Sequence, residues 1–147
     1  MSVKKLFIDC EFNSAGGQLL SMALVGADCD EFYAEIPLSN KEPVNGWVKD
    51  NVLPLMEFEN PLPLDVFQRE LEHFLNQYEA VHVIADWPED IKYFCEALIT
   101  GPGERINTPP LTMEIRRDLD APSKVPHHAL WDARGIRDLY LELEKAA

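Results

Sequence analysis

Apolar residues along this chain of 147 residues first form short runs typical of strands and later recur at the spacing of helices. The order of these patterns limits the folds that the chain can adopt. Apolar, β-branched and aromatic residues form short runs at residues 3–12, 19–26 and 31–36, which predicts three strands. The segment GADCD separates the last two runs, and its turn-forming residues suggest an antiparallel hairpin. The chain is therefore expected to begin with β-structure.

Helical and extended patterns alternate after this β-rich part. The segment NGWVKDNVLPLM predicts a short helix closed by Pro54. Apolar residues then recur every three or four positions from Asp65 to Tyr78, which predicts an amphipathic helix. This helix is expected to begin with a capping box formed by Asp65 and Gln68.

A fourth strand is predicted at AVHVIAD and a fifth around LTMEIRRDL. Between them, PEDIKYFCEALI predicts a helix with Pro88 in its first turn, and a last helix is expected from about His128 to Lys145. The apolar side of the helix after Pro88 is expected to carry Ile91, Phe94, Cys95 and Leu98. This order predicts an α/β fold with a mixed five-stranded central sheet and helices on its faces. The length suits one core, so residues 1–147 are expected to form a single domain.

Acidic residues outnumber basic ones two to one, with 26 Asp and Glu against 13 Lys and Arg and a formal net charge of −13. This balance argues against broad electrostatic binding of nucleic acid, because such binding depends on cations that displace counterions from the phosphates. It does not exclude a partner held through metal ions, since carboxylates that recruit divalent cations reverse the local field.

The sequence carries no sign of secretion or of membrane insertion. The start, MSVKKLF, lacks the apolar stretch and cleavage site of a signal peptide, and no run approaches the roughly 18 apolar residues of a membrane span. Three widely spaced cysteines fit buried thiols in a reducing compartment better than a disulfide framework. A cytoplasmic location without membrane association is therefore expected.

Two carboxylates interrupt the first apolar run, LFIDCEF, at Asp9 and Glu11. Side chains two positions apart in a strand point to the same face, roughly 7 Å from one another, so these acids should lie opposite Ile8, Cys10 and Phe12. One explanation is an edge strand with both acids in water. Because the flanking residues are apolar, a divalent cation that both carboxylates reach is the favoured explanation.

The last helix supplies a further acid in HHALWDARGIRDLYLEL. Asp132 falls in helical register with Ile136, on the side expected to face the sheet, and Gly135 permits close approach. His127 precedes the helix and is expected in the loop before it. The alternatives are an ordinary polar loop and a surface acid beside Arg134.

The segment ADWPEDIKYF offers two more candidates, Asp86 and Asp90. Asp86 ends the fourth strand, and one alternative is that it only caps the following helix. Asp90 lies in the first helical turn, where the helix dipole by itself favours an acid.

Together these segments resemble one family of nucleases. FIDCEF resembles the first, D-x-E, motif of the DEDDh branch of 3′-to-5′ exonucleases, and HHALWDA is similar to its last motif. The middle motif of that family, laid on this chain, favours Asp90 over Asp86 as the ligand. FYAEI and NGWVKDNVLP further resemble a small bacterial exoribonuclease subgroup. The chain departs from the family at Phe12 and Asn13, where many relatives have Thr, and at Glu89, where an aromatic residue is common.

The resemblance implies a ribonuclease H-like fold and a metal-dependent 3′-to-5′ exonuclease that releases nucleoside monophosphates. Its metal ligands would be Asp9, Glu11, Asp90 and Asp132. Two Mg²⁺ or Mn²⁺ ions would clamp the attacking and leaving oxygens, and His127 would act as general base. The substrate would be a nucleic acid 3′ end, with RNA favoured over DNA by the subgroup resemblance, and the protein would be a homodimer.

Substrate contacts are expected from the residues that follow the first motif, Phe12, Asn13 and Ser14. Four cations near the last motifs are candidates for steering the nucleic acid: Arg116, Arg117, Lys124 and Arg134. Three tryptophans are expected in the core or an interface and not as stacking platforms: Trp47, Trp87 and Trp131.

Three other readings stay open at this point. The chain could be a non-catalytic ribonuclease H-like nucleic-acid-binding module, or an exonuclease that acts on DNA 3′ ends. A zinc site of His82, His127, His128 and a cysteine is a further alternative, although no C-x-x-C or H-x-x-x-H spacing supports it.

Overall fold

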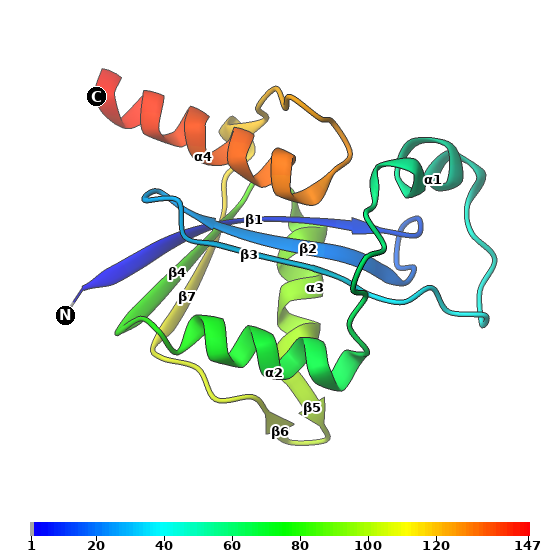
Figure 1. Cartoon of the computed structure of the whole chain (residues 1–147). Helices are drawn as coiled ribbons and strands as arrows, with labels where there is room; N and C mark the ends of the chain where they lie inside the picture. The colour runs from blue at the N-terminus through cyan, green and yellow to red at the C-terminus, as the bar shows by residue number, and fades with distance from the viewer. Residues whose placement is uncertain (1) are drawn as a thin grey trace.

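A five-stranded mixed sheet with strand order β3-β2-β1-β4-β7 forms the centre of the computed structural model, which describes residues 2–147 (Figure 1). Its strands are β1 (Val3–Phe12), β2 (Leu19–Gly26), β3 (Glu31–Glu35), β4 (Ala80–Ala85) and β7 (Leu111–Ile115). β1 pairs antiparallel with β2 and parallel with β4, while β2 pairs antiparallel with β3 and β4 parallel with β7. This is the predicted mixed sheet with helices on its faces, in the arrangement expected for a ribonuclease H-like fold.

Four α-helices and two short 3₁₀ helices connect and cover the strands. They are α1 (Gly46–Asn51), η1 (Leu53–Leu55), α2 (Leu64–Leu75), α3 (Pro88–Leu98), η2 (Arg117–Leu119) and α4 (Ala129–Ala146). A small hairpin of β5 (Ile99–Gly101) and β6 (Glu104–Arg105) follows α3 and was not predicted. No helix within residues 2–147 is long and apolar enough to cross a membrane.

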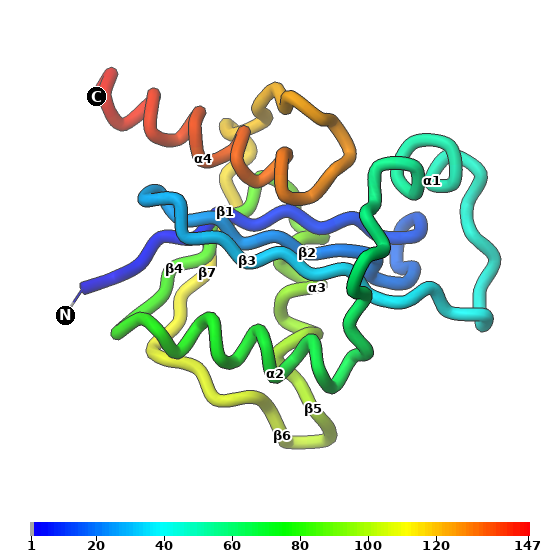
Figure 2. The backbone as a smooth tube through the Cα atoms, in the orientation of Figure 1, coloured from blue at the N-terminus to red at the C-terminus, as the bar shows by residue number. Residues whose placement is uncertain are grey.

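The alternation of side chains along β1 divides the core between the two faces of the sheet. Leu6, Ile8 and Cys10 pack in one cluster with apolar side chains of α2 and α3. Phe7 points to the opposite face and packs against Ile136 and neighbouring residues of α4. Accordingly, α4 runs along one face of the sheet and α2 and α3 cover the other (Figures 1 and 2).

Two expected helix caps are wrong. The helix α2 begins at Leu64, and no side chain caps it, because its N-cap residue is Pro63, whose side chain has no hydrogen-bond acceptor. The predicted capping box is therefore absent. The helix α3 likewise has Trp87 at its N-cap without a side-chain hydrogen bond, so Asp86 does not cap it.

The buried side of α3 also differs from the prediction. Its buried residues are Asp90, Tyr93, Phe94 and Ala97. Of the predicted apolar side, only Phe94 is fully buried, because the helix is rotated to bring its first-turn acid toward β1. This rotation places Asp90 beside the first motif.

Candidate active site

Carboxylates from three parts of the fold converge on Asp9. Asp9, Asp86 and Asp90 each offer an oxygen, and these atoms lie within 4.8 Å of one another. A second group, within the same distance, consists of Asp9, Glu11 and Asp132. Asp9 therefore belongs to both groups and links them.

The topology explains this convergence. β1 and β4 are parallel neighbours, so their carboxyl ends meet at the same edge of the sheet. Asp9 and Glu11 lie near the end of β1, Asp86 directly follows β4, and Asp90 lies one turn later in α3. Asp132 lies in the first turn of α4, which packs on the face of β1 toward which Asp9 points. β1 is the central strand, so the explanation that its two acids line a solvated edge is wrong.

Backbone hydrogen bonds hold two of the carboxylates in place. Asp90 Oδ1 accepts a hydrogen bond from the backbone N–H of Cys10 at 3.0 Å, which fixes α3 against β1. Asp132 Oδ2 accepts one from the backbone N–H of His127 at 3.1 Å. In contrast, Asp9 Oδ2 is buried and has no hydrogen-bond partner among the described residues. A buried, unpartnered carboxylate oxygen is costly unless a cation satisfies it.

Burial and mutual repulsion raise the pKa values of Asp9, Glu11 and Asp90. Burial, followed by the charges of Asp90 and Glu11, raises the pKa of Asp9 well above its ordinary value. Burial and the neighbouring Asp132 raise the pKa of Glu11 to about 8. Burial and the charge of Asp86 raise the pKa of Asp90 to about 8, against the hydrogen bond from Cys10. Without a cation, the ionised forms of these side chains are therefore disfavoured at neutral pH.

His127 lies in the loop before α4, as predicted, and is exposed. Its backbone adopts a left-handed conformation with φ of 71°, which the hydrogen bond to Asp132 helps to hold. The edge of its ring contacts Trp47, with ring centroids 4.8 Å apart. The imidazole is thus placed beside the carboxylates without being part of either oxygen cluster.

Of the three residues after the first motif, two line the site and one supports the following loop. Phe12 and Ser14 line the same pocket as the carboxylates, and Phe12 stacks on Tyr93 with centroids 4.8 Å apart. Asn13 is buried outside that pocket wall. Its amide nitrogen donates to Glu42 at 2.6 Å and to the carbonyl of Pro43 at 2.9 Å. Its side chain therefore anchors the following loop.

The carboxylates and His127 line a pocket of about 680 Å³, which we call the acidic pocket. Four further lining residues were not expected at the site: Asn45, Trp47, Trp87 and Asp120. Arg117, a predicted candidate for steering nucleic acid, also lines the pocket. Trp47 and Trp87 are 54% and 46% exposed, so their expected place in a core is wrong. These residues lie on short helices and connecting segments that have no long periodic pattern, and the only sequence signal was their position next to the motifs.

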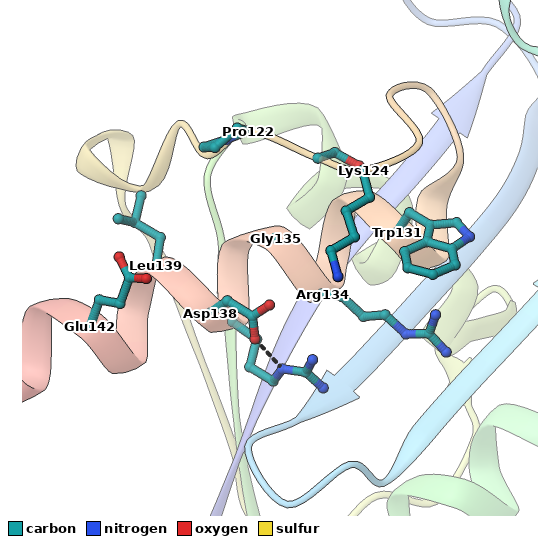
Figure 3. A pocket seen from close by; sticks show the side chains of 10 residues that line it. Pro122, Lys124, Trp131, Arg134, Gly135, Asp138, Leu139 and Glu142 are labelled. Carbon is teal, nitrogen blue, oxygen red and sulfur yellow. Dashed lines mark hydrogen bonds and ion pairs between the residues drawn. The ribbon is translucent and has the colours of Figure 1, made fainter.

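A second cavity, of about 380 Å³, lies along the outer side of α4, and we call it the helix groove (Figure 3). Pro122 and Lys124 on the preceding loop border it, and Trp131 and Arg134 lie at one end (Figure 3). Two of its three cations, Arg134 and Arg137, are already paired with carboxylates among the described residues. Arg134 binds both carboxylate oxygens of Glu31, at 2.6 and 2.7 Å, and the guanidinium also lies over Trp131.

The donor set of the acidic pocket fits hard divalent cations. Both clusters consist of carboxylate oxygens alone, which are the ligands preferred by Mg²⁺ and Mn²⁺, and the unpartnered Asp9 Oδ2 lacks the charge that such an ion supplies. The zinc alternative is not assembled within residues 2–147. His82 bonds Thr112 and Glu114, and His128 is buried against Tyr33.

Comparison with known proteins found no family model that matches the chain and no curated protein that matches it. The site itself combines oxygen ligands for hard cations with an imidazole beside them. This combination is suited to metal-assisted hydrolysis of a phosphate ester, in which a histidine removes a proton from water.

Proposed function

We propose that this chain is a metal-dependent 3′-to-5′ exonuclease of the DEDDh type, which hydrolyses nucleic acid from its 3′ end and releases nucleoside monophosphates. The observation that carries the proposal is the convergence of Asp9, Glu11, Asp90 and Asp132 in one pocket with His127 beside them. These are the five residues that the resemblance to that family singled out, and they come from β1, α3, α4 and the loop before α4.

The carboxylates would hold two divalent cations. Asp9 would contact both, because it belongs to both oxygen clusters. Glu11 and Asp132 would complete one position and Asp90 the other, with Asp86 close enough to contribute. Divalent cations bound at such a site lower the pKa of the attacking water and stabilise the charge that develops on the phosphate.

His127 would remove the proton from the attacking water. Its loop position leaves the ring exposed, and its backbone N–H is bound to Asp132, so the base is fixed relative to a metal ligand. The T-shaped contact with Trp47 restricts the ring on another side. General base catalysis of this kind contributes about 10²- to 10⁴-fold to the rate.

RNA is the substrate that we propose, on the subgroup resemblance of FYAEI and NGWVKDNVLP. DNA 3′ ends are the second candidate substrate, and a non-catalytic nucleic-acid-binding module is the rival from another class. The unpartnered oxygen of Asp9 favours a metal-dependent enzyme over the binding module, because binding alone does not require buried, mutually repelling acids.

The deciding experiment is an end-label nuclease assay. Single-stranded RNA, RNA duplexes with 3′ overhangs and matched DNA, each labelled at the 5′ end, are incubated with Mg²⁺ or Mn²⁺ and with a chelator control. Asp9→Ala and His127→Ala are compared with the wild type. We expect products shortened from the 3′ end, dependent on metal, lost in Asp9→Ala and strongly reduced in His127→Ala.

Several outcomes contradict the proposal. Product that forms in the presence of chelator, shortening from the 5′ end, or full activity of Asp9→Ala each exclude this enzyme class. A wild type that binds RNA but cleaves none of these substrates points to the binding module.

A further inference from the structure

The acidic pocket carries more negative charge than two bound divalent cations would neutralise. Six carboxylates line it, and Arg117 is the one lysine or arginine among its lining residues within the described chain. A nucleic acid strand brings further phosphates, which the remaining acids, Asp86 and Asp120 among them, repel. A cation at the pocket wall is therefore the natural place for a backbone phosphate to bind.

The other cations that the sequence placed near this region are committed elsewhere. Arg116 binds Asp118 through two nitrogens, at 3.1 and 2.6 Å. Arg134 is bound to Glu31 in the helix groove, and Lys124 lines that groove and not the acidic pocket. In contrast, Arg117 forms no ion pair with a carboxylate of residues 2–147.

Arg117 is nevertheless held in a defined position. One of its terminal nitrogens, Nη1, donates a hydrogen bond to the backbone carbonyl of Asp86, and its guanidinium lies over the ring of Trp87 at 4.8 Å from the centroid. A guanidinium carries five N–H donors, so this arrangement leaves most of them for a ligand. Stacking on an indole also preorganises the planar fork that matches phosphate oxygens.

We propose that Arg117 is the phosphate-binding residue of the acidic pocket and that Trp87 is the platform that orients it. The ligand is a backbone phosphate of a single nucleic acid strand, and this identity rests on the proposed function. Arg117 belongs to η2 and Asp86 to the end of β4, so the contact also ties the phosphate position to the strand that carries the metal site. The residue thereby selects for a charged strand over a neutral ester.

Equilibrium binding tests this assignment apart from cleavage. The His127→Ala protein keeps every carboxylate of the site, and its affinity for a short 5′-fluorescein-labelled single-stranded oligoribonucleotide is measured by anisotropy in Mg²⁺ over a range of NaCl concentrations. Arg117→Gln, Arg117→Lys and Trp87→Leu are added to this background. Arg134→Gln is the matched control, because its guanidinium is already bound to Glu31.

We expect Arg117→Gln to weaken binding at least about tenfold and to lower the slope of log affinity against log salt by about 1, as loss of one phosphate contact does. Arg117→Lys should keep the slope and lose part of the affinity, because an ammonium keeps the charge but not the fork. Trp87→Leu should weaken binding less than Arg117→Gln. Arg134→Gln should change neither quantity. A purely structural role of Arg117 would lower the melting temperature without changing the salt slope.

The outcomes separate this inference from the proposed function. If the wild type fails to cleave but binding depends on Arg117 as described, the nuclease proposal fails and the phosphate site stands. If the wild type cleaves and Arg117→Gln leaves affinity and slope unchanged, the phosphate site is wrong and the nuclease proposal stands. Absence of oligoribonucleotide binding by the His127→Ala protein also overturns the phosphate site.

Discussion

The acidic pocket and the helix groove both contain charged side chains and tryptophan, but they differ in how many of these charges have a partner of opposite sign. In the groove, Arg134 binds Glu31 through two hydrogen bonds, and Arg137 binds Asp138 at 3.0 Å. In the pocket, like charges from different elements face one another, and Asp9 Oδ2 has no partner. Most charged side chains around the groove therefore have a partner, whereas the six carboxylates of the pocket face one arginine and no lysine among the described residues.

This difference marks the acidic pocket, and not the helix groove, as the place where a bound cation would stabilise the protein most. Buried ionised groups without partners are among the costliest features of a folded chain. A protein that keeps several of them at one point must recover that cost when something binds there. Charged residues around a cavity are therefore weak evidence of a site, and unpaired charges of one sign are much stronger evidence.

The largest expected effect concerns the middle acid of the pocket. Asp90→Asn should lower kcat/KM for RNA by about 10²- to 10³-fold, the size typical of removing one preorganised electrostatic group. Asp90 is buried and bound to the N–H of Cys10, so its other oxygen is fixed toward Asp9. Asp86→Asn should cost less activity, because Asp86 is only partly buried and no backbone N–H of another strand fixes it.

The same pair of variants tests the corrected cap. Because Asp86 does not cap α3, Asp86→Asn should change the free energy of unfolding by less than the roughly 0.5 to 2 kcal/mol that a lost cap costs. Steady-state kinetics and chemical unfolding give both numbers. A folded Asp86→Asn protein that is inactive beside an active Asp90→Asn protein would reverse the assignment of the middle ligand.

Metal binding should stabilise the pocket and leave the groove unaffected. Mg²⁺ or Mn²⁺ at 100 times its dissociation constant should raise the free energy of unfolding by about 2.7 kcal/mol. Asp9→Asn should abolish this gain, since Asp9 links both carboxylate clusters. Thermal unfolding with and without each metal measures it, and Arg134→Gln is the control that should respond like the wild type. Equal stabilisation of Asp9→Asn would place the metal elsewhere.

The unpaired acids also predict how stability depends on pH in chelator. Glu11 and Asp90 have folded-state pKa values raised to about 8, and burial also raises the pKa of Asp9, above the values near 4 of unfolded carboxyls. Between these limits the folded protein binds more protons than the unfolded chain, so the free energy of unfolding falls as pH rises.

Asp9→Asn removes part of this penalty. The variant should be more stable than the wild type near pH 8, and the gain should shrink toward pH 4. Urea unfolding across this range in chelator measures the difference, which cancels the common contribution of surface charges. A stability gain of Asp9→Asn that does not change with pH would mean that ionisation of Asp9 beside its neighbours does not destabilise the folded protein.

The loop at residues 120–128 borders both cavities, so a substitution that moves it at the helix groove should also alter the acidic pocket. A Cβ at Gly135 would lie 2.7 Å from the carbonyl oxygen of Pro122, so Gly135→Ala forces the backbone of this loop to move. The clash costs roughly 1 to 3 kcal/mol, against a gain of up to roughly 1 kcal/mol for replacing a helical glycine. We expect a net destabilisation of about 1 kcal/mol.

Because His127 lies on the same loop, Gly135→Ala should also lower kcat more than it raises KM. Gly46→Ala is the matched control, since nothing lies within 4 Å of a Cβ built at that helical glycine. Stability and kinetics of both variants are compared with the wild type. If Gly135→Ala is stabilised and fully active, the loop does not position His127.

The sequence predicted the strands and helices whose side chains are buried at regular intervals along the chain. Alternation along β1 places Asp9 opposite Ile8 and Cys10, and the order of strand and helix patterns predicts the mixed sheet. The pocket walls formed by Trp47 and Trp87 were not predicted, and Arg117 was predicted only as one of four cations near the last motifs. Their positions depend on loops and on tertiary contacts, such as the hydrogen bond to the Asp86 carbonyl, that leave no period in the sequence.

The helix caps were mispredicted for a related reason. Asp65 and Gln68 have the spacing of a capping box, but the buried amide of Gln68 donates to the carbonyls of Ala97 and Ile99 instead. A tertiary hydrogen bond between α2 and the end of α3 thus overrides the local signal. The clustering of the proposed metal ligands was predictable because an unfavourable local feature, acids in a buried strand, required an explanation from elsewhere in the chain.

The smallest expected effect lies in the helix groove. Arg134→Gln removes a cation whose partner, Glu31, stays partly exposed to water, so the loss of stability should be below about 1 kcal/mol. Activity should stay within about twofold of the wild type, because no group of this pair lines the acidic pocket. The loss of stability should shrink at high salt, where exposed ion pairs are screened. If Arg134→Gln instead reduces nuclease activity as strongly as a pocket variant, paired charges do not mark an inert surface, and the helix groove must carry part of the substrate path.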